Sequence, residues 1–585
     1  MADAPKQSHT EEEALLFGAF LLLTFIGVLT WFVHTRLYIT GAEVIEITVY
    51  GLLAMLYAFE LARYYLHREE KLASLWPKPP IHISQAAEAE HLAEAAAQDS
   101  VLIGYDDSGK PFYWKNSVRS MQSMVIGLSG AGKTEFLKSV CQQDIARGGP
   151  VIFIDGKGDR KLVHQFLSYI DSVGRMDDVR VLDPTHSETS VSYNPFSAKP
   201  EQIDQHVAFI FDSFNRDKSS DSFFDEHQRT YLQNITRVMH HTGRLFNFYD
   251  VLVAAYDVET LQSLMRMAKN RVRMKGMATK QQVLTLDMSI YNLLNTFNEP
   301  DRVSKIQGLI NDMMTFMGED LALITGPYDN LLSLDDVIDH NLILIVSLNT
   351  NVESRSTTAL GRILLQNLQL MIGKRYADYK VGQIYPFVSV FMDEFAPFAY
   401  ANFATIINQA RDANVAFMTS MQNLRQMGEV SQSFQDNLGS SANTKFMLRT
   451  SEETTVDTFL KESAKIKTTR RSMKIETAGL FHSGVKVGDT GTQSEVVDTR
   501  AQDLHIKTMP TGQMELLMSD HKEGKIYEFL HIRRPFSHFA DRSPMSLYPM
   551  LKTPKWESSG LSLRFPELKL ESYRQDRGRN KRRGA

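Results

Sequence analysis

The residues with the clearest chemistry form the stretch Gly127-Leu-Ser-Gly-Ala-Gly-Lys-Thr134, which has the P-loop spacing of a glycine, four residues and then Gly-Lys-Thr. In such a loop, backbone N–H groups surround phosphate oxygens, the lysine neutralises the β- and γ-phosphates, and the threonine hydroxyl binds Mg²⁺. A predicted strand, Ser123–Ile126, precedes the loop, and a predicted helix, 134–146, presents its positive N-terminus to the anion. We therefore predict a site for ATP and Mg²⁺ with contacts from Gly127, Ser129, Gly130, Ala131, Gly132, Lys133, Thr134 and Glu135.

A P-loop site also needs a metal-holding carboxylate at the end of another strand. The two candidates are Asp155, after Val-Ile-Phe-Ile, and Asp393, after Val-Ser-Val-Phe-Met. We favour Asp393 because Glu394 follows it directly, so that Asp393 would orient the Mg²⁺ shell and Glu394 would polarise the attacking water. The loop Asp155-Gly-Lys-Gly-Asp159 would then border the site on a neighbouring strand.

Two more side chains complete the predicted catalytic set of Lys133, Glu394, Arg411 and Gln422. Gln422 follows a strand-like run and is expected to sense the γ-phosphate through its amide. Arg411, in Asn-Gln-Ala-Arg-Asp-Ala-Asn-Val, is a candidate arginine finger, which stabilises transition-state charge from across a subunit interface. A solvated surface position is the alternative interpretation for any single arginine.

The elements that must position these residues alternate between apolar strands and helices, which predicts an α/β fold with a mostly parallel sheet covered on both faces. Between about 201 and 339 strand signals almost disappear, and amphipathic runs such as 224–239, 251–267 and 303–317 predict an inserted all-helical domain. The predicted strands are 123–126, 151–154, 179–182, 342–348, 387–392, 415–419 and 445–448.

The N-terminal region predicts a membrane hairpin. Residues 14–33 carry no charge and have the length that crosses a bilayer, and a second apolar run, 44–62, follows a short loop. Basic residues from Arg63 to Lys78 then place the rest of the chain in the cytoplasm by the positive-inside rule. A signal peptide is disfavoured by Glu11, Glu12 and Glu13 and by the missing cleavage site. A hairpin buried in a soluble domain is the other alternative.

The net charge of −5 gives no general argument for nucleic acid, so such an argument rests on local basic stretches. Stretches 461–474 and 269–275 would neutralise phosphates without reading sequence, although a solvated surface is the alternative for each. The basic end, 574–585, is predicted to be disordered, with DNA, anionic lipid or nothing as its ligand. The single cysteine, Cys141, excludes an internal disulfide and a zinc cluster of cysteines. The predicted DNA contacts are Lys465, Lys467, Arg470, Arg471 and Lys474.

The order of these motifs resembles the type IV secretion coupling proteins of the TraD/TraG class, within the FtsK/HerA-like motor ATPases. The resemblance runs from the hairpin to about Asn443 and includes Tyr-Asn-Pro-Phe at 193–196, the helical stretch 223–232 and Ile-Val-Ser-Leu-Asn-Thr at 345–350. It implies a RecA-like motor domain, a hexameric ring at the bacterial inner membrane, and pumping of DNA with attached relaxase into a type IV secretion channel. It also places Arg411 at the family's arginine finger and Gln422 at its sensor glutamine.

The sequence therefore predicts five regions: a transmembrane hairpin (1–75), a linker (76–100), a motor domain (101–200 and 340–555), the helical insertion (201–339) and a basic tail (556–585). The sequence departs from many members in its short loop, 34–43, between the membrane helices and in lacking a long acidic tail. Three alternatives remain: a coupling ATPase that delivers protein effectors only, a nucleotide-gated receptor that does not hydrolyse ATP, and a chromosome-segregation motor of the FtsK kind.

Overall fold

The computed structural model divides the chain into two units, Met1–Pro80 and Ile81–Ala585. The predicted membrane hairpin, 14–33 and 44–62, lies outside the described residues, except for residues 51, 55 and 57. Among the helices within the described part of the chain, none combines the length and apolarity that a membrane crossing requires. The structure describes residues 51, 55, 57, 76–197, 203–214, 222–274, 278–297, 299, 301–329, 331–350, 354–377, 385–400, 403–463, 465–477, 485–499, 501–520, 524–536 and 560–565.

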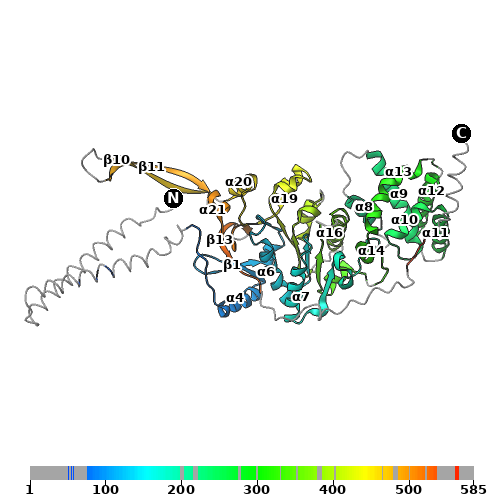
Figure 1. The fold of residues 1–585 in the computed structure, drawn as a ribbon, viewed down its shortest axis with the longest axis horizontal. Coiled ribbons are helices and arrows are strands. Elements are labelled where there is room, and N and C mark those ends of the chain that lie inside the picture. The colour runs from blue at the N-terminus through cyan, green and yellow to red at the C-terminus, as the bar shows by residue number, and fades with distance from the viewer. Residues whose placement is uncertain are drawn as a thin grey trace, which may run out of the picture. The chain divides into compact units, whose positions relative to one another are not determined.

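The central sheet has the strand order β2-β1-β13-β12-β9-β3-β8-β7-β4-β6-β5 in the described residues of the second unit (Figure 1). The strands from β9 to β5 pair in parallel, and the strands from β2 to β12 extend this sheet by antiparallel pairing. The predicted α/β fold with a mostly parallel sheet is therefore confirmed. The strands are β1 (Ser100–Tyr105), β2 (Pro111–Lys115), β3 (Ser123–Ile126), β4 (Val151–Asp155), β5 (Val179–Leu182), β6 (Ile343–Ser347), β7 (Val388–Asp393), β8 (Val415–Met421), β9 (Thr444–Met447), β12 (Gln513–Asp520) and β13 (Gly524–Ile532).

Both faces of the parallel strands are buried. Side chains along each strand point alternately to the two faces, so each strand contributes to two cores. In β4, Val151 and Phe153 join a core with α6 (Lys133–Ala146) and α7 (Arg160–Ser172). Ile152 and Ile154 point into the other core, which includes α16 (Ser354–Ala377), α17 (Phe403–Ala410) and α19 (Gln432–Ser441). Burial on both faces explains why these strands are nearly continuous apolar runs in the sequence.

The seven predicted strands are all confirmed, with ends that agree within two residues. The antiparallel strands β1, β2, β12 and β13 were missed. The other short helices of this domain are α4 (Gln85–Ala97), α5 (Asn116–Arg119), α18 (Arg425–Gly428), α20 (Glu453–Glu462) and α21 (Asp503–Thr508).

The segment between β5 and β6 forms mainly helices in the described residues, and α8 packs against α16. The amphipathic run 251–267 covers parts of two helices, because the chain is divided at Asp257. The side chain of Asp257 accepts the N–H of Thr260 at 2.9 Å, which caps a new helix. These helices are α8 (Ile203–Ser213), α9 (Ser222–His241), α10 (Phe248–Tyr256), α11 (Val258–Val272), α12 (Lys280–Phe297), α13 (Arg302–Met314), α14 (Glu319–Thr325) and α15 (Leu334–Asp339).

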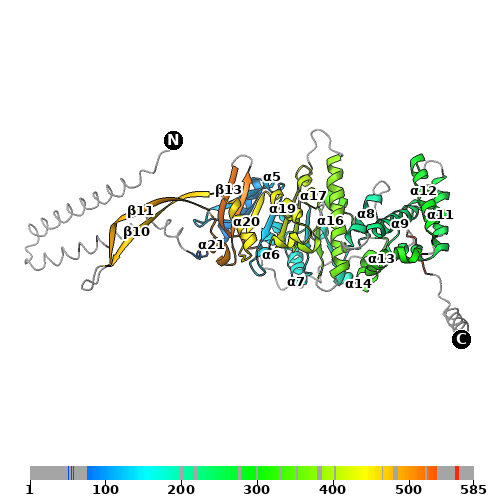
Figure 2. The ribbon, with the colours of Figure 1, turned by 90° about the horizontal axis from the view of Figure 1, so that it is seen from above.

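A separate two-stranded hairpin pairs β10 (Lys465–Thr477) with β11 (Val485–Thr499) (Figure 2). Its antiparallel register joins Lys465 to Thr499 and Thr477 to Val485. The five basic residues predicted to contact DNA all lie on β10, so the structure places them on one strand of the hairpin. Their role in DNA binding stays a prediction.

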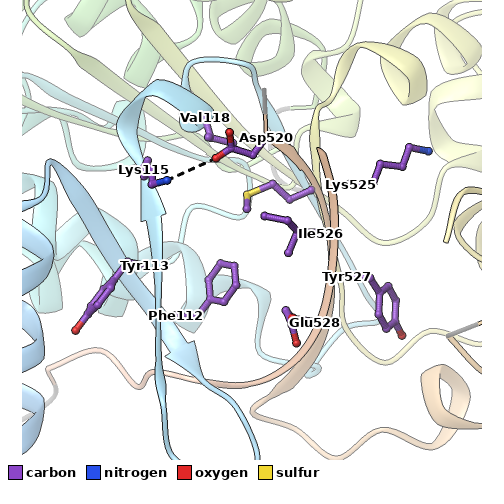
Figure 3. A pocket seen from close by; sticks show the side chains of 10 residues that line it. Phe112, Tyr113, Lys115, Val118, Asp520, Lys525, Ile526, Tyr527 and Glu528 are labelled. Atoms are coloured by element: carbon purple, nitrogen blue, oxygen red, sulfur yellow. Dashed lines mark ion pairs between the residues drawn. The ribbon is translucent and has the colours of Figure 1, made fainter. Parts of the chain in front are cut away.

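A pocket of about 390 Å³ lies between β2 and β13, away from the P-loop (Figure 3). The Nζ of Lys115 is 3.7 Å from the Oδ2 of Asp520 at one side of it. The pocket lies where β1 and β13 diverge. In the described residues these two strands pair only at Gly104 and Tyr105 of β1. The side chain of Gln143 satisfies both the N–H and the C=O of Leu102 at 2.9 Å, so α6 replaces a neighbouring strand there.

The described C-terminal segment, 560–565, packs on the helical insertion. Leu561 donates its N–H to the carbonyl of Leu245 at 2.8 Å, and the ring of Phe565 meets that of Tyr249 edge-on. Asp250 is fully buried and accepts the N–H of Leu563 at 2.8 Å and the hydroxyl of Tyr328 at 2.7 Å. One buried carboxylate therefore joins three separate parts of the chain.

Replacing Asp250 by alanine is expected to lower the free energy of unfolding by about 3 kcal/mol, because buried donors on Asn247, Tyr328 and Leu563 lose their acceptor. Thermal melting and proteolysis of the segment after Ile532 would measure the effect. The control is Asp287→Ala, which removes an exposed partner of Lys269 and should cost less than about 1 kcal/mol. Equal melting temperatures for the two variants would contradict this role of Asp250.

Candidate nucleotide-binding site

The P-loop connects β3 to α6 and is tied to both neighbouring strands. The N–H of Gly127 donates to the carbonyl of Met421 on β8 at 3.2 Å, and the N–H of Leu128 donates to the carbonyl of Arg449 after β9 at 2.9 Å. Gly130 and Gly132 have φ angles of +76° and +103°, which side chains other than glycine rarely tolerate. The glycines of the motif are thus required by the shape of the loop.

Lys133 begins α6 and lies inside the loop. Its Nζ donates to the carbonyls of Gly127 at 2.7 Å and Leu128 at 3.2 Å, and the residue is 4% exposed. Burial lowers the pKa of its ammonium from the usual value, against the opposing attraction of Glu394. A cation buried in this way is attracted strongly to an anion, since little water competes for it.

The side chains of Thr134 on α6 and Asp393 at the end of β7 are in contact, as expected of two residues that would bind the same metal ion. The Oγ1 of Thr134 donates to the Oδ2 of Asp393 at 2.6 Å. Asp393 ends β7 and is fully buried, and its Oδ1 accepts the hydroxyl of Ser420 on β8 at 2.7 Å. Ser420 was missed by the sequence analysis, although it fixes the carboxylate with Oδ2 facing Thr134.

Asp155, the other candidate metal ligand, stabilises its own loop. It ends β4 in register with Asp393 on β7. Its Oδ1 accepts the N–H of Lys157 at 3.0 Å, and its Oδ2 accepts the N–H of Asp159 at 2.7 Å. Both oxygens are thus engaged by backbone, and burial raises the pKa of the carboxyl. In this geometry Asp393, and not Asp155, contacts Thr134, and the loop 155–159 borders the Asp393–Glu394 pair. The choice of Asp393 as the metal ligand stays a prediction.

Glu394 is held in an unusual backbone conformation directly after β7. Its φ angle is +54°, and its N–H donates to the Oγ of Ser420 at 3.2 Å. A non-glycine residue in this region is strained, and such strain concentrates at functional sites. The Oε1 of Glu394 accepts the amide of Gln422 at 3.4 Å and lies 3.4 Å from the Nζ of Lys157. The structure thus brings Gln422 to Glu394, and it adds Lys157, which the sequence analysis had not singled out.

The remaining predicted contacts lie at the rim of the loop. Ser129 and Gly130 are exposed, and Ala131 is buried beneath them. Glu135 is also exposed, and its carboxylate pairs with the Nζ of Lys138 at 2.7 Å. The structure therefore places Glu135 beside the loop with a partner of its own on α6.

Arg411 is not brought to this site within one subunit. It follows α17 and precedes β8, whereas Gln422 follows the other end of β8. A strand of this length spans about 23 Å, so Arg411 and the P-loop lie at opposite ends of the parallel strands β8 and β3. Arg411 is exposed, and a role as an arginine finger requires a neighbouring subunit.

These features together define the class of the protein as one with a P-loop nucleotide-binding fold: a strand, a phosphate loop and a helix, with an Asp-Glu pair at the end of a nearby strand whose aspartate contacts the loop threonine. The donors fit a nucleotide, because the loop offers a buried ammonium and backbone N–H groups at a helix N-terminus. They fit Mg²⁺ as well, because a hydroxyl and a carboxylate are the oxygen ligands that it prefers.

Comparison with known proteins finds similarity to type IV coupling proteins. Residues 388–503 match the family described as the TraM recognition site of TraD and TraG. The type 4 coupling protein DotL of Legionella pneumophila is 21% identical over 497 residues, which cover 75% of this chain and 63% of DotL. Over these stretches the chain is similar to the type IV coupling proteins of the TraD/TraG family, and the match spans about 63% of the length of DotL.

Two other proteins are also similar to the chain. An uncharacterized protein of Mycoplasma pneumoniae is 33% identical over 86 residues, which cover 15% of this chain and 69% of that protein. Among solved structures, the plasmid coupling protein TrwB in complex with ADP and Mg²⁺ is 13% identical, with a TM-score of 0.48, over 77% of this chain and 93% of that one.

Proposed function

We propose that the protein is an ATP-driven motor in which Lys133, Thr134, Asp393 and Glu394 carry out hydrolysis. The observation that carries this proposal is the contact of Thr134 with Asp393 beside a Glu394 held at a φ of +54°. Bound Mg²⁺ would neutralise phosphate charge as the bond to the γ-phosphate breaks. Lys133 would exchange its loop carbonyls for phosphate oxygens, and Glu394 would take a proton from the attacking water.

The proposed assembly is a hexameric ring at the bacterial inner membrane, with the hairpin 1–75 in the membrane and the motor (101–200 and 340–555) and helical insertion (201–339) in the cytoplasm. Linker 76–100 and tail 556–585 complete this division. A ring supports the proposal that Arg411 acts on the next subunit, since each site of a head-to-tail interface then takes one residue from each neighbour. The position of Arg411 before the N-terminal end of β8, at the opposite strand end from the P-loop, supports such a shared site.

The proposed cargo is DNA with its attached relaxase, which the motor would pass to type IV secretion channel components. The match to a TraM recognition region supports contact with a relaxosome protein. The basic residues of β10 are the proposed grip on the DNA backbone, and such contacts are independent of sequence and sensitive to salt.

The test is ATP hydrolysis by the purified full chain with and without single-stranded DNA at two salt concentrations. We expect DNA to stimulate hydrolysis several-fold at low salt and much less at high salt, because counterion release drives phosphate contacts, whose affinity falls about 10³-fold or more between low and moderate salt. Lys133→Ala should abolish turnover under all conditions, whereas Lys161→Ala, an exposed lysine on α7, should leave it unchanged.

Each outcome separates the alternatives. Hydrolysis without any DNA effect at low salt would contradict the DNA motor and favour a coupling ATPase that delivers protein effectors only. ATP binding without hydrolysis would favour the nucleotide-gated receptor. Replacing the five basic residues of β10 by serine should remove the stimulation and keep the basal rate if β10 grips DNA.

A further inference from the structure

Lys157 places a second ammonium on the Asp-Glu pair of the candidate site. Its Nζ lies 3.3 Å from the Oδ2 of Asp393 and 3.4 Å from the Oε1 of Glu394. The Oδ2 of Asp393 is the same oxygen that accepts the hydroxyl of Thr134. The ammonium of Lys157 therefore occupies the side of Asp393 on which a metal shared with Thr134 would act.

The loop that carries Lys157 is built to hold its backbone in place. Asp155 accepts the N–H of Lys157, which fixes the start of the loop. A Cβ on Gly156 would lie 2.9 Å from the carbonyl oxygen of Glu394, and a Cβ on Gly158 would lie 2.6 Å from the Cβ of Asn349. Gly158 also has a φ angle of +66°. Glycine at position 156 therefore lets the loop approach Glu394 closely, and glycine at position 158 lets it approach Asn349.

The side chain of Lys157 differs from that of Lys133 in its freedom to move. Lys133 is enclosed by its own loop, whereas the Lys157 side chain is 40% exposed at the edge of the site. The long lysine side chain is flexible and carries a compact charge, so it can turn between nearby acceptors at little cost. Glu394 offers such an acceptor beside Asp393.

We propose that Lys157 is a positioning residue that acts as the resident cation of the Asp393–Glu394 pair and competes with Mg²⁺ for Asp393. This inference rests on the proposed function of the site. A divalent cation beside Asp393 repels the ammonium, so Lys157 gives up the Oδ2 of Asp393 and keeps Glu394 when the metal enters. Binding of the metal and release of Lys157 from Asp393 are thereby linked.

The test measures binding of a fluorescent ATP analogue by the full chain as Mg²⁺ is raised from zero in chelator to millimolar concentrations. Lys157→Met is expected to lower the Mg²⁺ concentration for half-maximal binding by about tenfold, because the competing positive charge is gone. Lys157→Arg keeps the charge and should remain within about twofold of the wild type, since both side chains carry one positive charge. Lys161→Met, on the exposed first turn of α7, is the matched control and should behave as the wild type.

Two results would overturn the inference. One is an unchanged Mg²⁺ dependence in a folded Lys157→Met protein. The other is loss of nucleotide binding in chelator by Lys157→Met, which would make Lys157 a phosphate ligand instead of a competitor for metal. The wild type separates this inference from the proposed function: if the wild type binds no ATP, the proposed function fails, whereas a wild type that binds and hydrolyses ATP with a silent Lys157→Met refutes only the role of Lys157.

Discussion

Glu394→Gln is expected to reduce kcat for ATP hydrolysis by about 10³-fold, because a general base contributes about 10²- to 10⁴-fold. The glutamine has the same size as glutamate but cannot take the proton of the attacking water. The variant should still bind ATP, since Lys133 and the loop glycines are untouched. Single-turnover hydrolysis and equilibrium binding on the same preparation would separate these two effects.

The matched control is Glu429→Gln, which changes an exposed glutamate directly after α18. It should hydrolyse ATP at the wild-type rate. A Glu394→Gln protein with turnover within tenfold of the wild type would show that another group activates the water. Loss of ATP binding by this variant would instead indicate that Glu394 supports the phosphate loop.

The sequence predicts the parallel half of the sheet well because those strands are buried on both faces and carry few polar residues. The antiparallel strands are harder to predict because their residue patterns are irregular. In β12 the buried Glu515 interrupts the apolar run, and its carboxylate accepts the hydroxyl of Tyr527 from β13. In β1 the backbone of Leu102 is satisfied by Gln143 of α6. Tyr527 lies on the next strand and Gln143 on a helix 41 residues from Leu102, and the residue pattern within β12 or β1 reveals neither partner.

The candidate site shows the same division. The loop lysine and threonine and the Asp-Glu pair follow from residue type and spacing, and the structure brings Thr134 to Asp393. Ser420 and Lys157 were missed because a serine inside a strand and a lysine between glycines have no distinctive spacing of their own. The one signal in the sequence was the pair of glycines that flank Lys157, since two such glycines at the end of a strand indicate a close backbone approach.

The Arg411→Ala variant tests whether a neighbouring subunit completes the nucleotide site. Arg411→Ala is expected to lower kcat by about 10³-fold or more, the range measured for arginine fingers, without weakening ATP binding in the same subunit. This expectation follows from the fold, because the P-loop and Arg411 lie at opposite ends of strands β3 and β8. Arg425→Ala, an exposed arginine on α18, is the matched control.

Mixing two inactive proteins gives the sharper result. Subunits with Lys133→Ala keep Arg411, and subunits with Arg411→Ala keep Lys133, so each supplies what the other lacks across a head-to-tail interface. In rings formed from equal amounts of the two, about a quarter of the interfaces regain both residues, and activity should recover in proportion. Mixing the wild type with a double Lys133→Ala, Arg411→Ala protein should give no gain beyond the wild type's own share of intact interfaces. Absence of recovery in rings shown by cross-linking to be mixed would mean that Arg411 does not act on the next subunit.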